Sequence, residues 1–239
     1  MKSNIDIGMM GEDFILWRCQ HEGALDEQSI MQWEDGSPLP YKELYKRNMP
    51  LLTKLIRIYG SCAVLAREGK KIVGYMRFYP KAVVESNGEG GLYFCLQQMY
   101  PEGPEDSLSE KEFMPLQKLE DKTLFVHCMM VGYPLIGQNP YLRKGIGKNM
   151  AGYLIEWARG RGWQAIETKT YEDIPYLYAI TGSAGKSFWE KLGFHAAKTE
   201  TEDILAGDNE FAQKARASAA DVGMDMALAS NAYIMRLEL

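Results

Sequence analysis

The stretch LFVHCMMV, residues Leu124–Val131, is an apolar run interrupted only by His127, and GIGKNMAGYLIEWARGR, residues Gly145–Arg161, follows it. A continuous apolar run of this kind is typical of a strand inside a sheet. In the second segment apolar residues recur three and four positions apart, as on one face of a helix, and Gly162 ends the pattern. The sequence therefore predicts a central strand, a loop over residues 132–144 and a long helix.

The start of this helix has the composition of an anion-binding site. Gly145 and Gly147 allow the backbone to approach a ligand closely, and the first amides of a helix are unpaired and lie at the positive end of its dipole. Arg143, Lys144 and Lys148 add cations, so the segment is suited to a diphosphate. A turn that uses glycine for its geometry and lysine for solubility is the alternative interpretation of this segment alone.

Two other nucleotide-binding patterns are excluded. A P-loop requires a further glycine at a fixed distance before its Gly-Lys pair, and Leu142 and Ile180 occupy that position ahead of Gly147 and Gly185. The dinucleotide fingerprint requires a third glycine where this chain has Met150.

A second block, FWEKLGF at Phe188–Phe194, follows a predicted strand at Ala165–Thr170. The order and spacing of the two blocks resemble the GNAT superfamily of acyl-CoA-dependent N-acyltransferases. In that family a loop of pattern Arg/Gln-x-x-Gly-x-Gly/Ala begins the helix that holds the CoA diphosphate, and the later block reads Phe-Tyr-Glu-Lys-Leu-Gly-Phe. A predicted hairpin at Cys62–Tyr79 lies where the family places its second and third strands. The resemblance is strong over 124–198, fair over 60–80 and weak elsewhere.

The resemblance implies an α/β (α+β) fold, with a mixed central sheet of about seven strands, flanked by helices and splayed at the central strand. A single N-acetyltransferase domain is expected over residues 1–239. Its core is expected over 60–200, with an insertion at 81–121, a variable N-terminal segment at 1–59 and a C-terminal helix and strand within 205–239.

Patterns outside the two blocks predict further elements. Phe14–Arg18 has the pattern of a first strand, Glu210–Ala220 that of a helix and Tyr233–Leu239 that of a final strand. A strand at the C-terminus often lets the edges of two sheets meet, so a homodimer is one possible assembly.

The activity that the resemblance implies is transfer of an acetyl group from acetyl-CoA to a primary amine. The implied cofactor-binding residues lie on the central strand, at the helix start and in the second block: Met130, Val131, Arg143, Lys144, Gly145, Ile146, Gly147, Lys148, Phe188 and Trp189. In the family, free amides of the central strand pair with the pantetheine arm and one of them points at the thioester carbonyl. Here that catalytic amide is expected to belong to Met129. No metal is expected, because the cysteines and histidines lack the spacing of metal ligands.

His127 is the candidate general base. It lies two residues before Met129, so strand alternation predicts that both side chains share a face, and a histidine with a pKa of about 6.5 can accept the proton of an amine. The family also contains a member with a histidine base at the matching position. A core histidine bonded to a neighbouring carbonyl is the alternative interpretation. Glu167 and Glu172 are other candidate bases, and both are expected to be solvated at strand ends.

Trp189 stands where many members of the family have the tyrosine that protonates the leaving thiolate. An indole N–H is a donor without an accessible pKa and cannot supply that proton. Tyr171, Tyr176, Tyr178 and water are the alternative sources, and the sequence does not rank them. The departure also supports a second interpretation of the whole chain, a catalytically weak or inactive acyl-CoA-binding module that acts as a sensor or in assembly.

The composition is that of a soluble globular protein, since 46% of the 239 residues are hydrophobic and 25% are charged. The formal charge of -5 makes broad binding of nucleic acid unfavourable. No apolar run approaches the ~20 residues that span a bilayer, and the acidic start of the chain is unlike a signal peptide. We therefore expect a cytoplasmic protein without a membrane partner. The segments 20–59 and 81–121 are expected to roof the cleft, which favours a small-molecule amine as the acceptor.

Overall fold

The structure is a computed structural model that describes residues 5–17, 25–26, 39–86, 113–132, 139–181 and 184–239. Most of the predicted insertion 81–121 and part of the predicted roof 20–59 lie outside the described residues.

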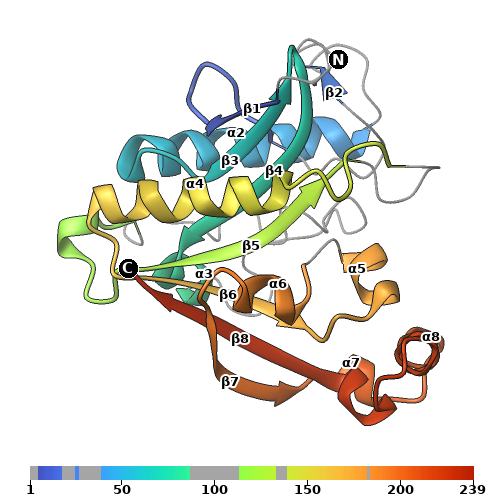
Figure 1. Cartoon of the computed structure of the whole chain (residues 1–239). Helices are drawn as coiled ribbons and strands as arrows, with labels where there is room; N and C mark the ends of the chain where they lie inside the picture. The colour runs from blue at the N-terminus through green and yellow to red at the C-terminus, as the bar shows by residue number, and fades with distance from the viewer. Residues whose placement is uncertain (1–4, 18–24, 27–38, 87–112, 133–138, 182–183) are drawn as a thin grey trace.

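Strands from both ends of the chain form one mixed sheet, in the order β1-β3-β4-β5-β6-β8-β7 (Figure 1). The strands of this path are β1 (Ile5–Met9), β3 (Ala63–Glu68), β4 (Lys71–Pro80), β5 (Thr123–Val131), β6 (Ala165–Tyr171), β7 (His195–Thr201) and β8 (Asn231–Glu238). A two-residue strand, β2 (Leu25–Asp26), pairs with β4 beside the path. Among the described strands β5 and β6 form the parallel pair and the other pairs are antiparallel. The expected mixed sheet is therefore confirmed.

The helices connect these strands and flank the sheet. They are α2 (Leu39–Tyr59), α3 (Lys81–Ser86), α4 (Ile146–Arg161), α5 (Pro175–Thr181), α6 (Lys186–Glu190), α7 (Asp203–Ala206) and α8 (Glu210–Asp221), with short 3-10 helices η3 (Leu116–Lys118) and η4 (Met226–Ser230). The helix α4 is the predicted long helix, and it ends at Gly162, whose left-handed φ of 85° suits glycine. The predicted helix Glu210–Ala220 is confirmed as α8.

The core lies around β4, in which nine of the ten residues are buried. The helix α4 packs over one face of the sheet, where the rings of Phe78 and Trp157 have their centroids 5.3 Å apart. On the other face, the Arg77 guanidinium donates a hydrogen bond of 2.8 Å to the carbonyl oxygen of Leu16. Leu16 belongs to the buried segment Phe14–Trp17, which has no regular structure, so the strand predicted there is wrong. The first strand is β1.

The C-terminal part of the sheet differs from the expectation in one respect. The final strand β8 lies between β6 and β7, so both of its edges are paired and β7 forms the outer edge. The reasoning that a final strand offers a free edge to a second copy is therefore wrong for this chain. The connection between β7 and β8 holds α7, α8 and η4, which form a small hydrophobic cluster together with residues of the α5 segment.

Candidate functional site

The strands β5 and β6 pair only over the first part of their length. The parallel register begins at Thr123 opposite Ala165 and ends at Val126 opposite Thr168, whereas β5 continues to Val131 and β6 to Tyr171. The Thr168 hydroxyl donates to the Val126 carbonyl oxygen at 3.1 Å, beside the last pair. Beyond it the two strands diverge and are no longer paired (Figure 1), and we call the region between their unpaired ends the wedge. The predicted splay at the central strand is confirmed.

The backbone of Met129 is directed toward this wedge. The Gly132 amide donates to the Val73 carbonyl oxygen at 2.7 Å, so Gly132 is a hydrogen-bonded position of the antiparallel ladder with β4. Because such positions alternate with positions whose polar groups point away, the amides of Val131 and Met129 face the β6 side. The side chain of Asn139 donates to the Val131 carbonyl oxygen at 2.8 Å, as this alternation requires. The backbone of Met130, by the same count, faces β4.

The start of α4 offers backbone amides for binding, because the first N–H groups of a helix have no partner within the helix. Gly145 precedes the helix with φ of 77° and Arg143 has φ of 59°, so two left-handed residues lie just before the first turn. Alternation of right- and left-handed residues forms concave amide surfaces that bind anions. Gly145 is the N-cap residue and has no side chain, so it cannot accept a hydrogen bond from the amides of the first helical turn. The cationic side chains of Arg143, Lys144 and Lys148 are exposed beside it.

The two sequence blocks meet at Gly147. A β-carbon on Gly147 would lie 3.4 Å from the sulfur of Met129 and 3.7 Å from Cε2 of Phe188. Gly147 thus brings together the central strand β5, the start of α4 and the short helix α6. The sequence predicts that these three segments surround one ligand; the structure brings them next to one another at Gly147, and the ligand itself stays a prediction.

Trp189 lies in an aromatic cluster on α6. It is 3% exposed, and its ring makes edge-to-face contacts with Phe188 and Phe194, at centroid distances of 5.1 Å and 5.0 Å. The indole therefore contributes to the core, while Phe188 is half-buried and contacts the start of α4. The cofactor contact expected of Trp189 stays a prediction.

His127 lies at a bulge in β5. The register with β4 runs from Arg77 opposite Cys128 to Phe78 opposite Val126, so His127 is the extra residue. Its ring lies 6.0 Å from that of Tyr79. Met76 of β4 lies opposite Met129, so these two side chains share a face of the sheet. Tyr79 lies three residues after Met76 and therefore faces the other side. The prediction that His127 and Met129 share a face is therefore wrong, because an extra residue inverts the alternation.

Glu167 is buried, against the expectation that it is solvated. It is 5% exposed, and its carboxylate lies 2.6 Å from Nη1 of Arg236 and 2.9 Å from Nζ of Lys81. Both carboxylate oxygens of Glu167 are therefore occupied by cationic partners at the closed end of the wedge, so this side chain is poorly placed to accept a proton from an amine. Glu172 is half-buried, accepts a hydrogen bond from the Tyr233 hydroxyl and lies 3.7 Å from Nζ of Lys186.

The three candidate tyrosines have different surroundings. Burial raises the pKa of Tyr171, and the negative charge of the nearby Glu202 carboxylate raises it further. The ring of Tyr176 packs on Phe211, with centroids 5.6 Å apart. Tyr178 is 40% exposed, and partial burial of its side chain raises its pKa. Tyr178 therefore has the most accessible hydroxyl of the three.

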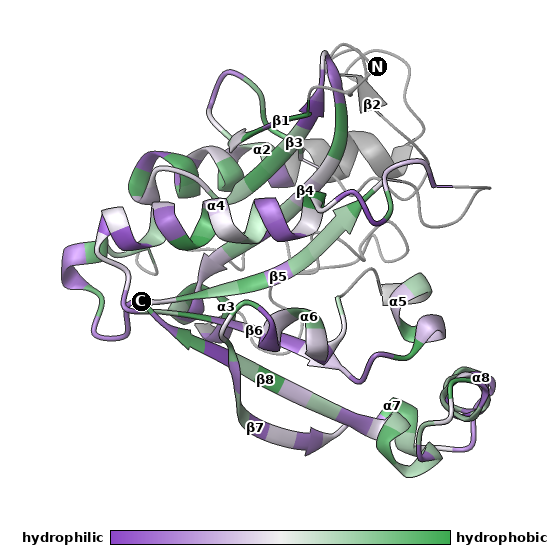
Figure 2. Cartoon of the chain, in the orientation of Figure 1, coloured by the Kyte–Doolittle hydropathy of each residue, from purple (hydrophilic) through white to green (hydrophobic). Residues whose placement is uncertain are grey.

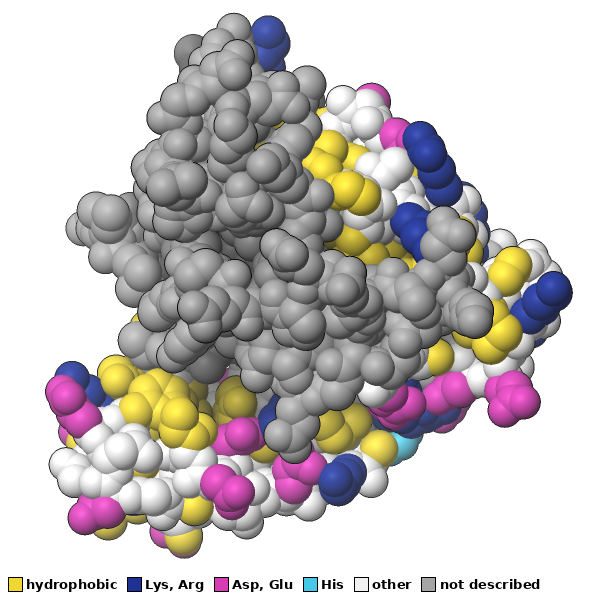
Figure 3. Space-filling view, turned by 180° about the vertical axis from the view of Figure 1, so that it is seen from behind, with side chains coloured by type: hydrophobic (Ala, Val, Ile, Leu, Met, Phe, Trp, Pro, Cys, Tyr) yellow, Lys and Arg dark blue, Asp and Glu magenta, His cyan; other side chains and the backbone are white. Residues whose placement is uncertain are grey.

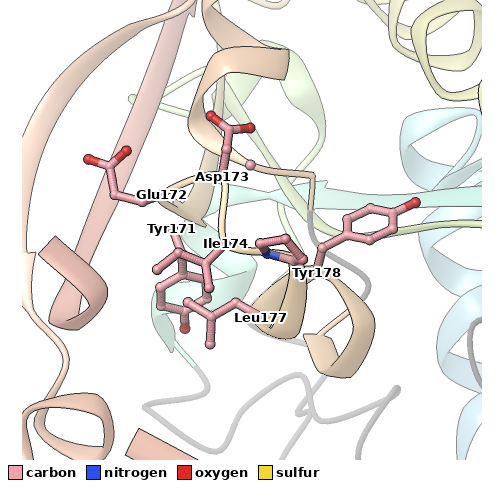
Figure 4. A pocket seen from close by; sticks show the side chains of 8 residues that line it. Tyr171, Glu172, Asp173, Ile174, Leu177 and Tyr178 are labelled. Atoms are coloured by element: carbon pink, nitrogen blue, oxygen red, sulfur yellow. The ribbon is translucent and has the colours of Figure 1, made fainter. Parts of the chain in front are cut away.

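A cavity of about 220 Å³ lies at the carboxyl end of β6 (Figure 4). Its lining comes from one segment of chain, from the end of β6 through α5 to the residue before α6: Tyr171, Glu172, Asp173, Ile174, Pro175, Leu177, Tyr178 and Gly185. In Figure 4 the rings of Tyr171 and Tyr178 point to different sides, and the two carboxylates point away from Leu177. No sequence motif predicts this cavity.

The rest of the described surface adds little to the site. On the face drawn in Figure 3, Lys and Arg side chains stand among Asp and Glu side chains. In the part of the chain that the structure describes, no cluster of His, Cys, Asp or Glu is arranged to hold a metal ion. None of the described helices combines the length and the hydropathy of a membrane span.

Comparisons with known proteins return a match only among solved structures. No family model matches the chain. No curated protein matches it either. A polyamine N-acetyltransferase from Drosophila melanogaster, described as forming N-acetylagmatine, aligns with a TM-score of 0.48 at 12% identity, over 99% of this chain and 100% of that chain. An N-acetyltransferase from Staphylococcus aureus Mu50 aligns with a TM-score of 0.47 at 11% identity, over 99% of both chains. An acetyltransferase from Bacillus subtilis, in complex with CoA, aligns with a TM-score of 0.40 at 15% identity, over 74% of this chain and 76% of that chain.

The mixed sheet and the splay at its central strand are the features of the fold that the resemblance of the two sequence blocks implies. The central parallel pair opens toward the start of α4, and the second block closes the site from α6. Sheet topology and motif order together give this chain the fold of the GNAT superfamily.

Proposed function

We propose that this chain is a single-domain enzyme that transfers an acetyl group from acetyl-CoA to the primary amine of a small molecule. The observation that supports it is the wedge between β5 and β6, into which the Met129 amide faces, beside the amide-rich start of α4 at Gly147. A backbone donor facing a gap and a helix start able to bind a diphosphate are the two features that an acyl-CoA substrate requires of its site.

The residues present fit acetyl-CoA along this path. The amides from Gly145 to Lys148, with the exposed cations Arg143 and Lys144, would hold the diphosphate. The backbone of β5 on the wedge side would pair with the pantetheine arm, and Phe188 would line the arm from α6. In this placement the thioester lies near Met129.

The reaction joins the amine nitrogen to the thioester carbon and breaks the carbon–sulfur bond. The Met129 amide donates to the oxygen that becomes negative during attack, which is where a fixed donor lowers the barrier most. In this proposal His127 accepts the proton that the amine loses. Its ring lies on the Tyr79 face and not on that of the Met129 side chain, so we expect a water molecule to relay the proton.

The leaving thiolate also needs a proton. Trp189 cannot supply it, because an indole N–H is a donor without an accessible pKa. Among the tyrosines after β6, Tyr178 is the most accessible, so the proposal takes this hydroxyl or a water molecule as the donor.

A second candidate function follows from Trp189. Its ring is part of the core and cannot act as an acid. An acyl-CoA-binding sensor without turnover needs no acid for the thiolate, so the tryptophan is compatible with that function. We favour the enzyme, because the Met129 amide faces the place where the thioester oxygen would become negative during attack, and a fixed donor there lowers the barrier to acyl transfer.

Calorimetric titration with acetyl-CoA, followed by a thiol-release assay over a panel of amines, tests both functions. Binding together with acceptor-dependent thiol release supports the enzyme. Binding without release on any amine supports the sensor, and folded protein that binds neither CoA nor acetyl-CoA contradicts both.

A further inference from the structure

The cavity at the end of β6 opens at the same edge of the sheet as the proposed acyl-CoA site. Since β5 and β6 are parallel, their carboxyl ends lie at one edge. Tyr171 is the last residue of β6 and lines the cavity, as does Gly185, just before α6. Three residues after Gly185, Phe188 contacts the start of α4. A single turn of α6 therefore separates the cavity from the site proposed for acetyl-CoA.

We propose that this cavity binds the body of the acceptor, and that the acceptor is a monoamine with a compact apolar body, such as one aromatic ring. The inference rests on the proposed function and names the substrate class of that site. Its support comes from three properties of the lining: polarity, charge and rigidity.

The wall of the cavity is mainly apolar. Ile174, Pro175 and Leu177 line it, together with the rings of Tyr171 and Tyr178. Its volume of about 220 Å³ is below the ~300 Å³ at which pockets for drug-sized ligands begin. The space suits a small body that gains affinity by leaving water.

Both carboxylates at the rim already have partners. Asp173 accepts hydrogen bonds from the amide and the hydroxyl of Ser187, at 3.0 Å and 2.9 Å. Glu172 accepts from Tyr233 and pairs with Lys186, whose ammonium also lies over the Tyr233 ring. A polyamine would need unpaired carboxylates for its additional charges, so the rim favours a single ammonium group.

The cavity is supported from behind by the connection between β7 and β8. Ile174 and Leu177 are each 1% exposed and belong to the cluster with Leu205, Ala215 and Ala219 of α7 and α8. The Glu202 carboxylate, which lies near Tyr171, is 2.5 Å from Nζ of Lys169. These contacts fix the walls before a ligand binds, which favours selection by size.

Tyr178 provides the test, because it lines the cavity and is exposed enough to be replaced without loss of the fold. The variants are Tyr178→Ala and Tyr178→Phe, and the control is Tyr153→Ala, a tyrosine of similar exposure on α4. The probes are 2-phenylethylamine and spermidine as acceptors, with acetyl-CoA and octanoyl-CoA as donors.

We expect the parent to prefer 2-phenylethylamine over spermidine in kcat/KM. Tyr178→Ala is expected to raise KM for 2-phenylethylamine at least about tenfold, with an unchanged Kd for acetyl-CoA, because it removes a wall that contacts the substrate body. Tyr178→Phe keeps the ring, so its KM is expected to stay near that of the parent, as is that of Tyr153→Ala. A fall in kcat for Tyr178→Phe at unchanged KM would show that the Tyr178 hydroxyl gives its proton to the leaving thiolate. The unchanged KM would show that the ring still forms the wall of the cavity.

Three results would overturn the inference. The first is a preference of the parent for spermidine, and the second is an unchanged KM for 2-phenylethylamine in Tyr178→Ala. The third is a changed preference between acetyl-CoA and octanoyl-CoA in Tyr178→Ala, which would place the acyl chain in the cavity. Titration of 2-phenylethylamine into the CoA-saturated protein separates this failure from failure of the proposed function. Binding that is weakened in Tyr178→Ala supports the cavity even without turnover, and absence of binding to the parent contradicts it.

Discussion

The two halves of the sheet, on either side of the wedge, are built differently. The first half, β1-β3-β4-β5 under α4, is a dense apolar core in which β4 is buried along almost its whole length. The second half, β6-β8-β7 with α5 to α8, has an edge strand β7 in which six of seven residues are exposed, and Figure 2 shows hydrophilic residues along β7 and β8. The proposed cofactor groups lie mainly in the first half, and the cavity lies in the second.

This difference indicates a division of labour. A cofactor that is the same in every turnover suits a half with a dense core and a long helix, whereas the half that we propose to select the acceptor contains short helices and surface ion pairs. The halves are joined by four residue pairs between β5 and β6 and by the buried contact of Glu167 with Lys81, which precedes β5 along the chain.

Replacement of His127 tests the proposed chemistry of the first half and is expected to have the largest effect. His127→Ala should lower kcat/KM for the best amine by about 10² to 10⁴, because general-base catalysis contributes that much, with an unchanged Kd for acetyl-CoA. The matched control is His195→Ala, an exposed histidine on β7 in the second half. Activity within about threefold of the parent would exclude His127 as the base.

Replacement of Glu167 tests how the halves are held together. Glu167→Gln leaves Arg236 and Lys81 without their common carboxylate, so we expect a loss of about 3 kcal/mol in the free energy of unfolding, measured with urea. The control Glu156→Gln removes an exposed ion pair with Arg159 and should cost less than about 0.5 kcal/mol. Equal losses in the two variants would show that the buried contact does not hold the halves together.

The sequence predicted the first half well, because its signals are local. The apolar run of β5 and the periodicity of α4 follow from residues near one another along the chain. The same reasoning failed for His127, since one bulge inverts the alternation and no local pattern marks it. It also failed for Glu167, whose partners Lys81 and Arg236 are remote in sequence.

The second half was predicted in its elements but not in its site. The helix α8 and the strand β8 lie where their patterns indicate, yet the sequence does not show that β8 enters the sheet between β6 and β7. The cavity depends on packing of α5 against residues of the β7–β8 connection, which is a tertiary arrangement without a motif.

A negative charge introduced at the start of α4 tests whether this helix start binds acetyl-CoA, because it should weaken binding more than it lowers the stability of the fold. Gly147→Asp places a carboxylate among the amides that would hold the diphosphate, so we expect acetyl-CoA to bind about 50-fold more weakly by calorimetry. Thermal stability should fall less than binding does, because an acidic residue is favourable in the first turn of a helix, although its β-carbon lies against Met129 and Phe188. The control is Gly152→Asp, on the same helix, where a β-carbon meets nothing within 4 Å. If both variants bind acetyl-CoA like the parent, the diphosphate is not held at Gly147.

The smallest effect is expected from the ion pairs behind the cavity. Glu200 pairs with Lys198 at 2.7 Å and with Lys169 at 3.3 Å, and the hydrogen bond from Lys198, with that from Lys169, lowers the pKa of Glu200 below its ordinary 4.5. A lowered pKa stabilises the fold above pH 4.5, and this contribution is lost as the pH falls through the lowered value. Glu200→Gln should therefore be less stable than the parent at pH 7 by under about 1 kcal/mol, and the difference should shrink toward pH 3. A double-mutant cycle with Lys198→Gln, measured by urea unfolding at both pH values, isolates the pair. A deficit at pH 3 as large as at pH 7 would mean that Glu200 acts through packing and not through its charge, and the second half would then resemble the first more closely than its exposed strand suggests.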